Sequence, residues 1–213
     1  TKEIKIMSYM GDVKSKFFET TTAAGDAVIA AAARPTSTFT LTTGTGSAAG
    51  MGTNIGRKIT ATTTGSSDGG KTVALVGIGV DGEALEETIT LLGSAATTAG
   101  TTNYFASVTT ATVSAQPAAN VSLGILTASA GQVFAGPTRV RQANVYSGGA
   151  IGNVDFRNVT TAGTSLLVVR TNGTEGNSTT VNIPQDGVFF NQPGVFVTFD
   201  ETDCNAVTVY FDG

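Results

Sequence analysis

The 213-residue chain contains no histidine and no tryptophan, and it has a single cysteine, Cys204. Without histidine it cannot form a Ser-His-Asp triad or a zinc site with imidazole ligands. One thiol cannot form an intramolecular disulfide, so the chain is not a disulfide-stabilised secreted domain. A cysteine nucleophile would also lack its usual base. We therefore expect Cys204 to be a passive core or surface residue.

Charged residues are also scarce, at 13% of the chain, and the net charge is -4 with only 12 lysines and arginines. No basic run is present, which disfavours nucleic acid and a membrane surface as partners. No stretch of about 18 apolar residues could span a membrane. The N-terminal sequence lacks the uninterrupted apolar core of a signal peptide.

Threonine and glycine are abundant instead. Threonine is β-branched and favours strands, while glycine serves turns. Segments with alternating or aliphatic patterns recur at roughly ten-residue spacing, which is typical of a sandwich or barrel. In the first part of the chain the expected strands are 37–43, 57–64, 71–80, 83–93, 101–115 and 120–126, whereas 27–34 fits a short helix or a strand equally well.

The segment TASAGQVFAGP (127–137) is small and uncharged, and we interpret it as a domain junction. Beyond it, aromatic residues become denser and seven or eight short strands are expected. Val154 and Phe156 alternate with polar residues, as do the stripes 195–199 and 207–211. The run LLVV (166–169) does not alternate, which favours a strand covered on both faces. We predict an all-β protein with two small β-sandwich or jelly-roll-like domains: residues 1–130, Thr-rich with an irregular leading segment, and residues 131–213.

One motif suggests nucleotide chemistry. The glycines of GIGVDG (77–82) fit the G-x-G-x-x-G pattern and follow an apolar run, as in a dinucleotide-binding fingerprint. That fingerprint needs a helix next and an acidic residue about 20 positions later. No Asp or Glu occurs between Thr88 and Val154, and Asp81-Gly82 is a strong hairpin signal. The sequence therefore predicts a tight primed turn between strands 71–80 and 84–92, with Glu87 as the one acid on the apolar side.

Other candidate sites are weaker. The cluster DETDCN (200–205) offers oxygen ligands for a hard cation but lacks the spacing of a calcium loop, so we expect a solvated turn. No carboxylate pair is singled out for glycoside hydrolysis. N-x-S/T patterns are expected by chance in so threonine-rich a chain, and they begin at Asn120, Asn158, Asn172 and Asn177. We assign no catalytic, cofactor-binding or metal-binding residue, and expect no enzyme and no cofactor.

Four arginines supply all of the positively charged side chains after residue 137. Arginine is a frequent interface anchor because it pairs bidentately and stacks on rings. The alternatives are ordinary exposed strand residues, which we favour, or contacts in an assembly. The residues are Arg139, Arg141, Arg157 and Arg170.

Residues 57–124 resemble a module of tailed-bacteriophage structural proteins, notably of short-tailed and cyanobacterial phages. The resemblance is carried by GVDGEALEETITLLG and TTNYFASVTTATVSA, and the C-terminal half is similar to small β domains of the same class of virion proteins. It implies a virion component made in the host cytoplasm. The expected role is capsid decoration: a cement protein on the outer capsid surface that bridges the major capsid protein as a homo-oligomer, with a trimer favoured. The alternatives are a tail, knob or fibre component that binds the host, and a glycan-degrading enzyme on a β scaffold.

Overall fold

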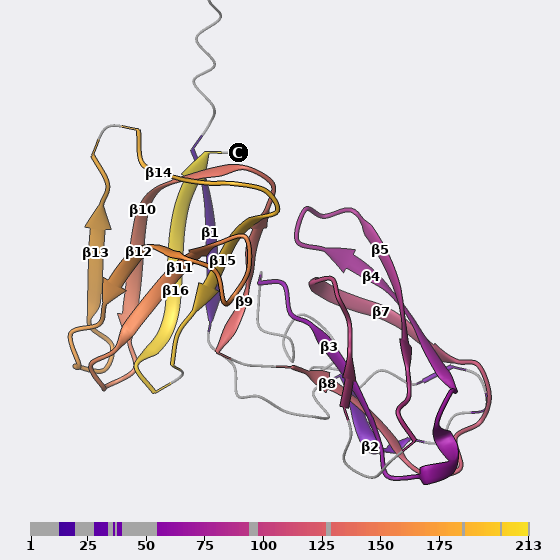
Figure 1. Cartoon of the computed structure of the whole chain (residues 1–213). Helices are drawn as coiled ribbons and strands as arrows, with labels where there is room; N and C mark the ends of the chain where they lie inside the picture. The colour runs from indigo at the N-terminus through magenta and orange to yellow at the C-terminus, as the bar shows by residue number, and fades with distance from the viewer. Residues whose placement is uncertain are drawn as a thin grey trace, which may run out of the picture.

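A computed structural model describes residues 13–19, 28–33, 36, 38–39, 55–93, 98–126, 129–184, 186–200 and 202–212. These residues form sixteen strands and one short 3-10 helix, η1 (Ser66–Asp68), with no α-helix. Within them, therefore, no helix is long and apolar enough to cross a membrane. The all-β prediction is confirmed, and the sheets form two sandwich-like units (Figure 1).

The C-terminal sandwich packs two antiparallel sheets face to face. Sheet A runs in the order β1 (Lys14–Glu19), β16 (Cys204–Asp212), β10 (Thr138–Ser147) and β13 (Ser178–Asn182), and β14 (Val188–Phe190) also pairs with β10. Sheet D runs in the order β12 (Ser165–Arg170), β11 (Asn153–Asn158), β15 (Gly194–Thr198) and β9 (Ala130–Ala135).

The N-terminal sandwich is built in the same way from two smaller sheets. Sheet B runs in the order β2 (Ile29–Ala33), β8 (Val121–Ile125), β3 (Ile59–Thr63) and β6 (Thr98–Gly100). Sheet C runs in the order β5 (Ala84–Thr90), β4 (Thr72–Gly79) and β7 (Phe105–Val113). Within the ambiguous segment 27–34, residues 29–33 form a strand. Of the expected strand 37–43, only Thr38 and Phe39 lie within the described residues, and Phe39 donates its N–H to the Ala111 carbonyl.

Each sandwich encloses its own apolar core. Period-two patterns are confirmed where one face of a strand is buried: Val154 and Phe156 are fully buried, and so are Val207 and Val209. Because successive side chains on a strand point to opposite faces, alternation places one set inside and leaves the polar set outside.

The expected junction at 127–137 lies where the chain leaves strand β8 of sheet B and enters strand β9, which pairs with β15 in sheet D. Its small residues have a packing role. A Cβ on Gly131 would lie 2.6 Å from the Gly56 carbonyl oxygen, so only glycine permits the two sandwiches to approach so closely here. The strand over residues 130–135 was not predicted, because small residues serve close packing as well as flexibility.

Strand β1 also differs from the expected division at residue 130. It pairs along its whole length with β16, from Lys14 opposite Phe211 to Glu19 opposite Ala206. Phe18 enters the C-terminal core, and the Lys16 ammonium donates to the Val133 carbonyl of β9 on the facing sheet. Burial lowers the pKa of Lys16 to about 8. This leading strand therefore completes the C-terminal sandwich.

The LLVV run is not covered on both faces of its strand. Strand β12 is the end strand of sheet D, and Leu166 and Val168 are 40% and 48% exposed on its outer face. Leu167 and Val169 face the core. The prediction failed because a continuous apolar run shows only that both faces of the strand are apolar. It does not show whether another element covers each face.

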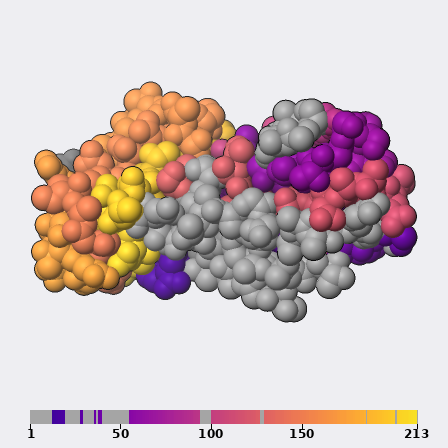
Figure 2. Space-filling view, turned by 90° about the horizontal axis from the view of Figure 1, so that it is seen from below, coloured from indigo at the N-terminus to yellow at the C-terminus, as the bar shows by residue number. Residues whose placement is uncertain are grey.

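The two sandwiches meet at residues 55–57, and Figure 2 shows them as separate lobes, the C-terminal strands in orange and yellow and the N-terminal ones in purple and magenta. Gly56 and Gln132 exchange both backbone hydrogen bonds across the junction, while Arg57 exchanges both with Phe105 of the N-terminal sandwich. Ile55 is buried in the C-terminal core. Residues 55–57 thus connect the two sandwiches through consecutive contacts, and these contacts fix the position of one sandwich relative to the other.

Candidate functional site: the cleft between the sandwiches

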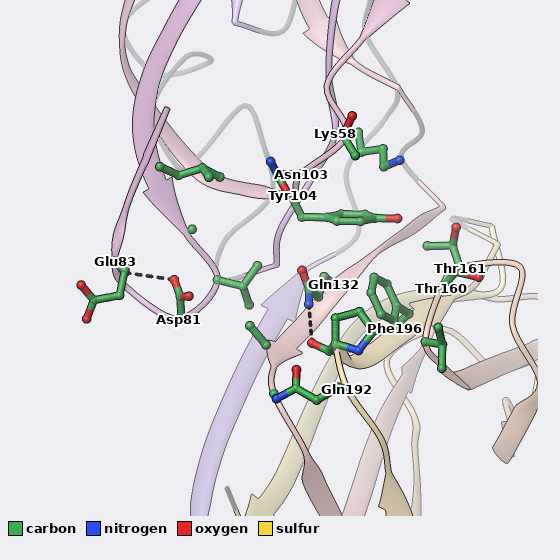
Figure 3. Close-up of a pocket in the computed structure, with 18 of the residues that line it drawn as sticks. Lys58, Asp81, Glu83, Asn103, Tyr104, Gln132, Thr160, Thr161, Gln192 and Phe196 are labelled. Atoms are coloured by element: carbon green, nitrogen blue, oxygen red, sulfur yellow. Dashed lines mark hydrogen bonds between the residues drawn. The ribbon is translucent and has the colours of Figure 1, made fainter. Parts of the chain in front are cut away.

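A cleft of about 760 Å³ lies where the two sandwiches meet (Figure 3). The N-terminal unit contributes the tip of the β4–β5 hairpin and residues 102–104 before β7. The C-terminal unit contributes residues 159–162 after β11, together with parts of β9, β15 and the turn at Gln192 and Pro193. Clefts of this size at domain interfaces are common places for small ligands.

The glycine motif of the sequence forms the hairpin tip at this cleft. Gly77 and Gly79 lie in strand β4, and β5 follows as a strand, so the dinucleotide fingerprint is rejected. Gly79 donates to the Glu83 carbonyl, Gly82 donates to the Gly79 carbonyl, and Asp81 accepts from the Glu83 N–H.

The expected hairpin is confirmed, but its turn type is not. Among the described residues only Gly82 of this loop has a positive φ, at 85°. Residues 80–82 therefore form a three-residue hairpin loop, which ends in one left-handed residue. The expected two-residue primed turn does not form. At Gly77 the side-chain position is closed, because a Cβ would lie 2.1 Å from the Ser107 carbonyl oxygen of β7.

Glu87 holds the N-terminal side of the cleft. Its carboxylate accepts hydrogen bonds from the backbone N–H groups of Thr102 and Asn103 and from the Asn103 side-chain amide. Thr101, buried next to them, accepts from the Ile59 N–H and donates to the Asn103 carbonyl. This explains why an acid occupies the inward-facing side of β5: it binds the loop that carries Tyr104.

Tyr104 joins the two units across the cleft. Its ring centre lies 5.2 Å from that of Phe196 of β15 in an edge-to-face arrangement. The Lys58 ammonium lies over the Tyr104 ring, 5.3 Å from the ring centre. Burial raises the pKa of the Tyr104 hydroxyl, and a hydrogen bond with the Thr161 side chain partly offsets that rise. Tyr104 therefore contacts sheet D and the loop after β11 at once.

Arg157 holds the C-terminal side of the cleft. Its guanidinium donates to the Gly163 carbonyl at 2.9 Å, to the Thr198 hydroxyl at 2.9 Å and to the Asp155 carboxylate at 3.3 Å. The arginine closes the loop 159–163 against sheet D. These contacts are internal, so Arg157 is not the ordinary exposed strand residue that was expected.

The other three arginines have different surroundings. Arg141 pairs with the Asp212 carboxylate at 2.5 Å. Arg139 lies 5.4 Å from the Phe189 ring centre and donates to the Asp186 carbonyl. Arg170 is exposed on β12 beside Leu166 and Val168.

Val159 on the cleft rim is strained. Its φ is 73°, the one positive value among the described non-glycine residues, and a β-branched side chain disfavours that conformation. The Val159 side chain is 43% exposed, so packing does not compensate for the strain. Strained residues of this kind cluster at binding and switch sites.

We expect Val159→Gly to raise the free energy of unfolding by about 1 kcal/mol, because release of the backbone strain exceeds the entropy that glycine adds to the unfolded chain. Urea denaturation measures the change. Val159→Ala is the control, since alanine removes the β-branching but keeps the strain caused by the Cβ, so it should stabilise the protein less than glycine does. A glycine variant less stable than the alanine variant would contradict this account.

The remaining candidates lie away from the cleft. Asp200 of the acidic cluster accepts from the Thr202 N–H and hydroxyl, and these bonds lower the pKa of Asp200. The cluster forms the turn between β15 and β16, as expected, and its Glu201 lies outside the described residues. Cys204 is fully buried in the C-terminal core, and burial raises the pKa of its thiol to about 12, which keeps it protonated.

Sequence reasoning missed the cleft because its parts come from distant segments. The signal that could have pointed to it was Glu87, the one acid on an otherwise apolar strand face. Comparison with known proteins adds no identification: no protein-family model matches the chain, and neither a curated protein nor a solved structure does. The site is therefore defined by its geometry, which offers hydroxyl, amide and carboxylate groups around a half-buried aromatic ring.

Proposed function

We propose that this chain is a structural protein of a tailed-bacteriophage particle that decorates the outer capsid surface. There it would bridge copies of the major capsid protein as a homo-oligomer, with a trimer as the favoured assembly. The proposal draws on the resemblance of residues 57–124 and of the C-terminal half to virion modules. It also draws on apolar surface that both sandwiches leave exposed.

The observation that carries the proposal is the outer face of β12. Leu166 and Val168 are exposed side by side on an edge strand, next to the exposed Arg170. We call these three residues the β12 strip. Exposed apolar groups on an edge strand are an aggregation liability unless a partner covers them. A continuous LLVV run suits a strand that becomes covered on its second face in an assembly.

The N-terminal sandwich has a comparable surface on sheet C. Val76 and Ile78 of β4 are 37% and 40% exposed. Their cross-strand partners are Glu86 and Ala84 on β5 and Thr110 and Ser107 on β7. Two such surfaces on a rigid two-lobed molecule allow contact with two neighbours. Repeated by symmetry, many modest contacts of this kind would hold adjacent capsomers against the outward pressure of packed DNA.

The test is the position and copy number of the chain in a reconstruction of the intact particle. Copies at symmetry-equivalent positions over the whole shell would support decoration. A few copies at the tail vertex would contradict it.

A reconstitution assay tests the β12 strip directly, by adding purified protein to particles that lack it. We expect the double variant Leu166→Asp/Val168→Asp to lose binding, because two charges would be buried without partners. Leu126→Asp is the matched control, since Leu126 is 55% exposed and lies outside both surfaces. Equal binding by the double variant and the control would remove the strip from the interface.

A tail, knob or fibre component with a host-binding role is the second candidate. The observation that favours it is the cleft, whose loops are held in place on both sides by Glu87 and Arg157. Binding of the isolated protein to host cells, together with a location at the tail, would select this role.

A further inference from the structure

We infer that the cleft between the sandwiches is a binding site for a short oligosaccharide built of neutral or amino sugars. The inference goes beyond the structural role proposed above and does not depend on where the protein lies in a particle. It stands on three observations: the fixed loops, the strain at the rim and the chemistry of the lining.

Both loops of the cleft are fixed by side chains behind them. Glu87 binds three donors of residues 102–103, and Arg157 reaches the far end of the loop 159–163 while also binding Thr198 and Asp155. A site whose supporting shell holds its loops in advance loses less entropy on binding.

The strain at Val159 points to the same place. Its left-handed backbone aims the segment 160–162 at the cleft, and Arg157 maintains this shape by binding Gly163. Thr160 and Thr161 thereby face Tyr104 and Lys58 across the opening (Figure 3). The strained backbone conformation therefore lies where the two units meet around a cavity.

The lining matches the surface of a sugar. Tyr104, Val80 and Pro193 present apolar surface, while Asn103, Thr160 and Glu83 present donors and acceptors beside it. Sugars carry hydroxyl groups around the ring and apolar C–H faces, so they need both kinds of group at close range. The cleft volume of about 760 Å³ is large enough for several linked sugar rings. It also falls in the usual range for ligand sites.

The charges select among sugars. The lining contains two acids, Asp81 and Glu83, and one base, Lys58. The net negative charge of the lining would repel a phosphorylated or acidic ligand, whereas it would not repel neutral or amino sugars. Asp81 is already bound to the Glu83 N–H through one oxygen, and the Glu83 side chain is exposed at the mouth of the cleft.

The experiment is an amide-shift titration of the full chain by NMR with three probes: maltopentaose, penta-N-acetylchitopentaose and tetragalacturonate. We expect at least one of the two uncharged probes to bind with a dissociation constant of about 1 mM or tighter. The shifted amides should be those of residues 80–84, 102–104 and 159–163. The acidic probe should bind at least about tenfold more weakly.

Variants separate the cleft from the rest of the surface. Tyr104→Ala should weaken binding at least about tenfold, and Glu83→Gln, an exposed position that leaves the fold unchanged, should weaken it several-fold. Tyr146→Ala, on the outer face of sheet A, is the matched aromatic control and should bind as the parent does. Val159→Gly should bind more weakly because the loop becomes freer.

Three outcomes would overturn the inference. Neither uncharged probe producing a saturable shift would do so, and so would shifts confined to residues outside the cleft. Equal affinity of Glu83→Gln, Val159→Gly and the parent would place the sugar elsewhere, even if Tyr104→Ala failed to fold. None of these outcomes bears on the copy number in the particle, so the structural role and the sugar site fail separately.

Discussion

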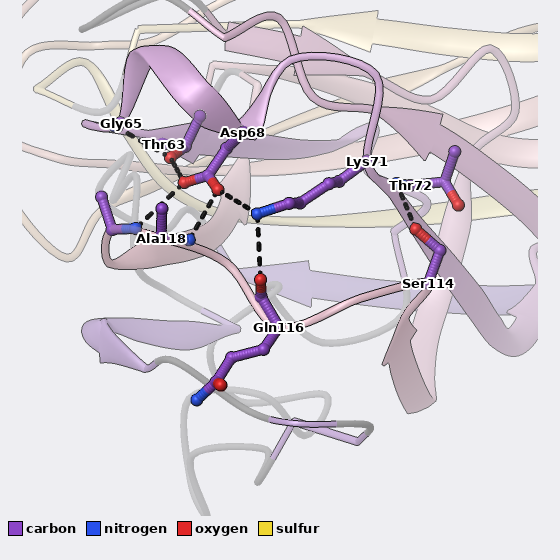
Figure 4. A network of polar contacts seen from close by, with 9 residues as sticks. Thr63, Gly65, Asp68, Lys71, Thr72, Ser114, Gln116 and Ala118 are labelled. Atoms are coloured by element: carbon purple, nitrogen blue, oxygen red, sulfur yellow. Dashed lines mark hydrogen bonds and ion pairs between the residues drawn. The ribbon is translucent and has the colours of Figure 1, made fainter.

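Replacing Asp68 by alanine is expected to lower the free energy of unfolding by about 4 kcal/mol, the largest effect of any single polar substitution we propose. Asp68 lies in η1 with its side chain fully buried, and its carboxylate accepts four hydrogen bonds (Figure 4). The donors are the Thr63 hydroxyl at 2.9 Å, the Lys71 ammonium at 2.7 Å, and the N–H groups of Ala118 and Ala119 at 2.7 and 3.1 Å. Removing the acceptor leaves buried donors without partners, which costs several kcal/mol.

Two further variants show which part of this network matters. Asp68→Asn removes the charge but keeps one acceptor oxygen. It should therefore lower the free energy of unfolding by less than the alanine variant does. Lys71→Met removes the ammonium that pairs with Asp68, and the Lys71 side chain is 23% exposed. This variant should lower the free energy of unfolding by about 1 kcal/mol. Urea denaturation of the three variants gives the order. A loss below about 1 kcal/mol for Asp68→Ala would show that the loop 114–120 is held by other contacts.

The same network makes stability depend on acid. Burial raises the pKa of Asp68, but the hydrogen bonds from Lys71, Ala118, Thr63 and Ala119 outweigh it and hold the pKa well below its usual range. Below the unfolded pKa of about 3.9 the unfolded chain therefore binds more protons than the folded one. The contribution of Asp68 is fully present above that pH and is lost as the pH falls. Between about pH 5 and pH 2 the parent should lose stability more steeply than Asp68→Asn.

Strand positions were predictable because local pattern determines them. Thr-rich or aliphatic segments located β4, β5, β7 and β8, alternation of apolar and polar residues located β11 and β16, and Asp81-Gly82 located the hairpin. The turn type was not predictable, since Asp81-Gly82 occurs in both two-residue and three-residue loops. Which of them forms depends on the pairing of Gly79 with Glu83.

Long-range relations were not predictable from the same patterns. Nothing local in β1 states that its partner is β16 at the other end of the chain, and nothing local in 127–137 distinguishes a linker from a strand packed against Gly56. The cleft depends on such relations throughout. Glu87 was visible as an exception to alternation, but the loop that it binds lies 15 residues away in sequence.

Arg157 shows the same limit for charge. An arginine alternating with apolar residues on a strand looks like an exposed residue or an interface anchor. Its partners here are Gly163 in the following loop and Thr198 on the neighbouring strand, and only the fold brings both within reach. Arg57 was harder still, because a strand-initial arginine gives no sign that it will be buried.

Replacing Arg57 by alanine is the second substitution with a large expected effect, a loss of about 3 kcal/mol in the free energy of unfolding. Arg57 is 1% exposed at the junction, its guanidinium donates to the Ala130 carbonyl at 2.6 Å, and it lies 5.8 Å from the Phe199 ring centre. Alanine would leave a cavity between the sandwiches and a buried carbonyl that has lost a donor. Burial already lowers the pKa of Arg57 to about 10, which shows that its charge is costly there.

The charge and the volume of Arg57 can be separated. Arg57→Met keeps most of the apolar stem and removes the charge, so its loss should be only about 1 kcal/mol. Arg170→Ala, at an exposed position, should change stability by less than about 0.5 kcal/mol. Hydrogen exchange should also show faster exchange at the paired amides of Gly56 and Gln132 in Arg57→Ala than in Arg57→Met. Unchanged exchange at both amides would mean that the backbone pairing alone holds the junction, and that Arg57 stabilises each sandwich separately.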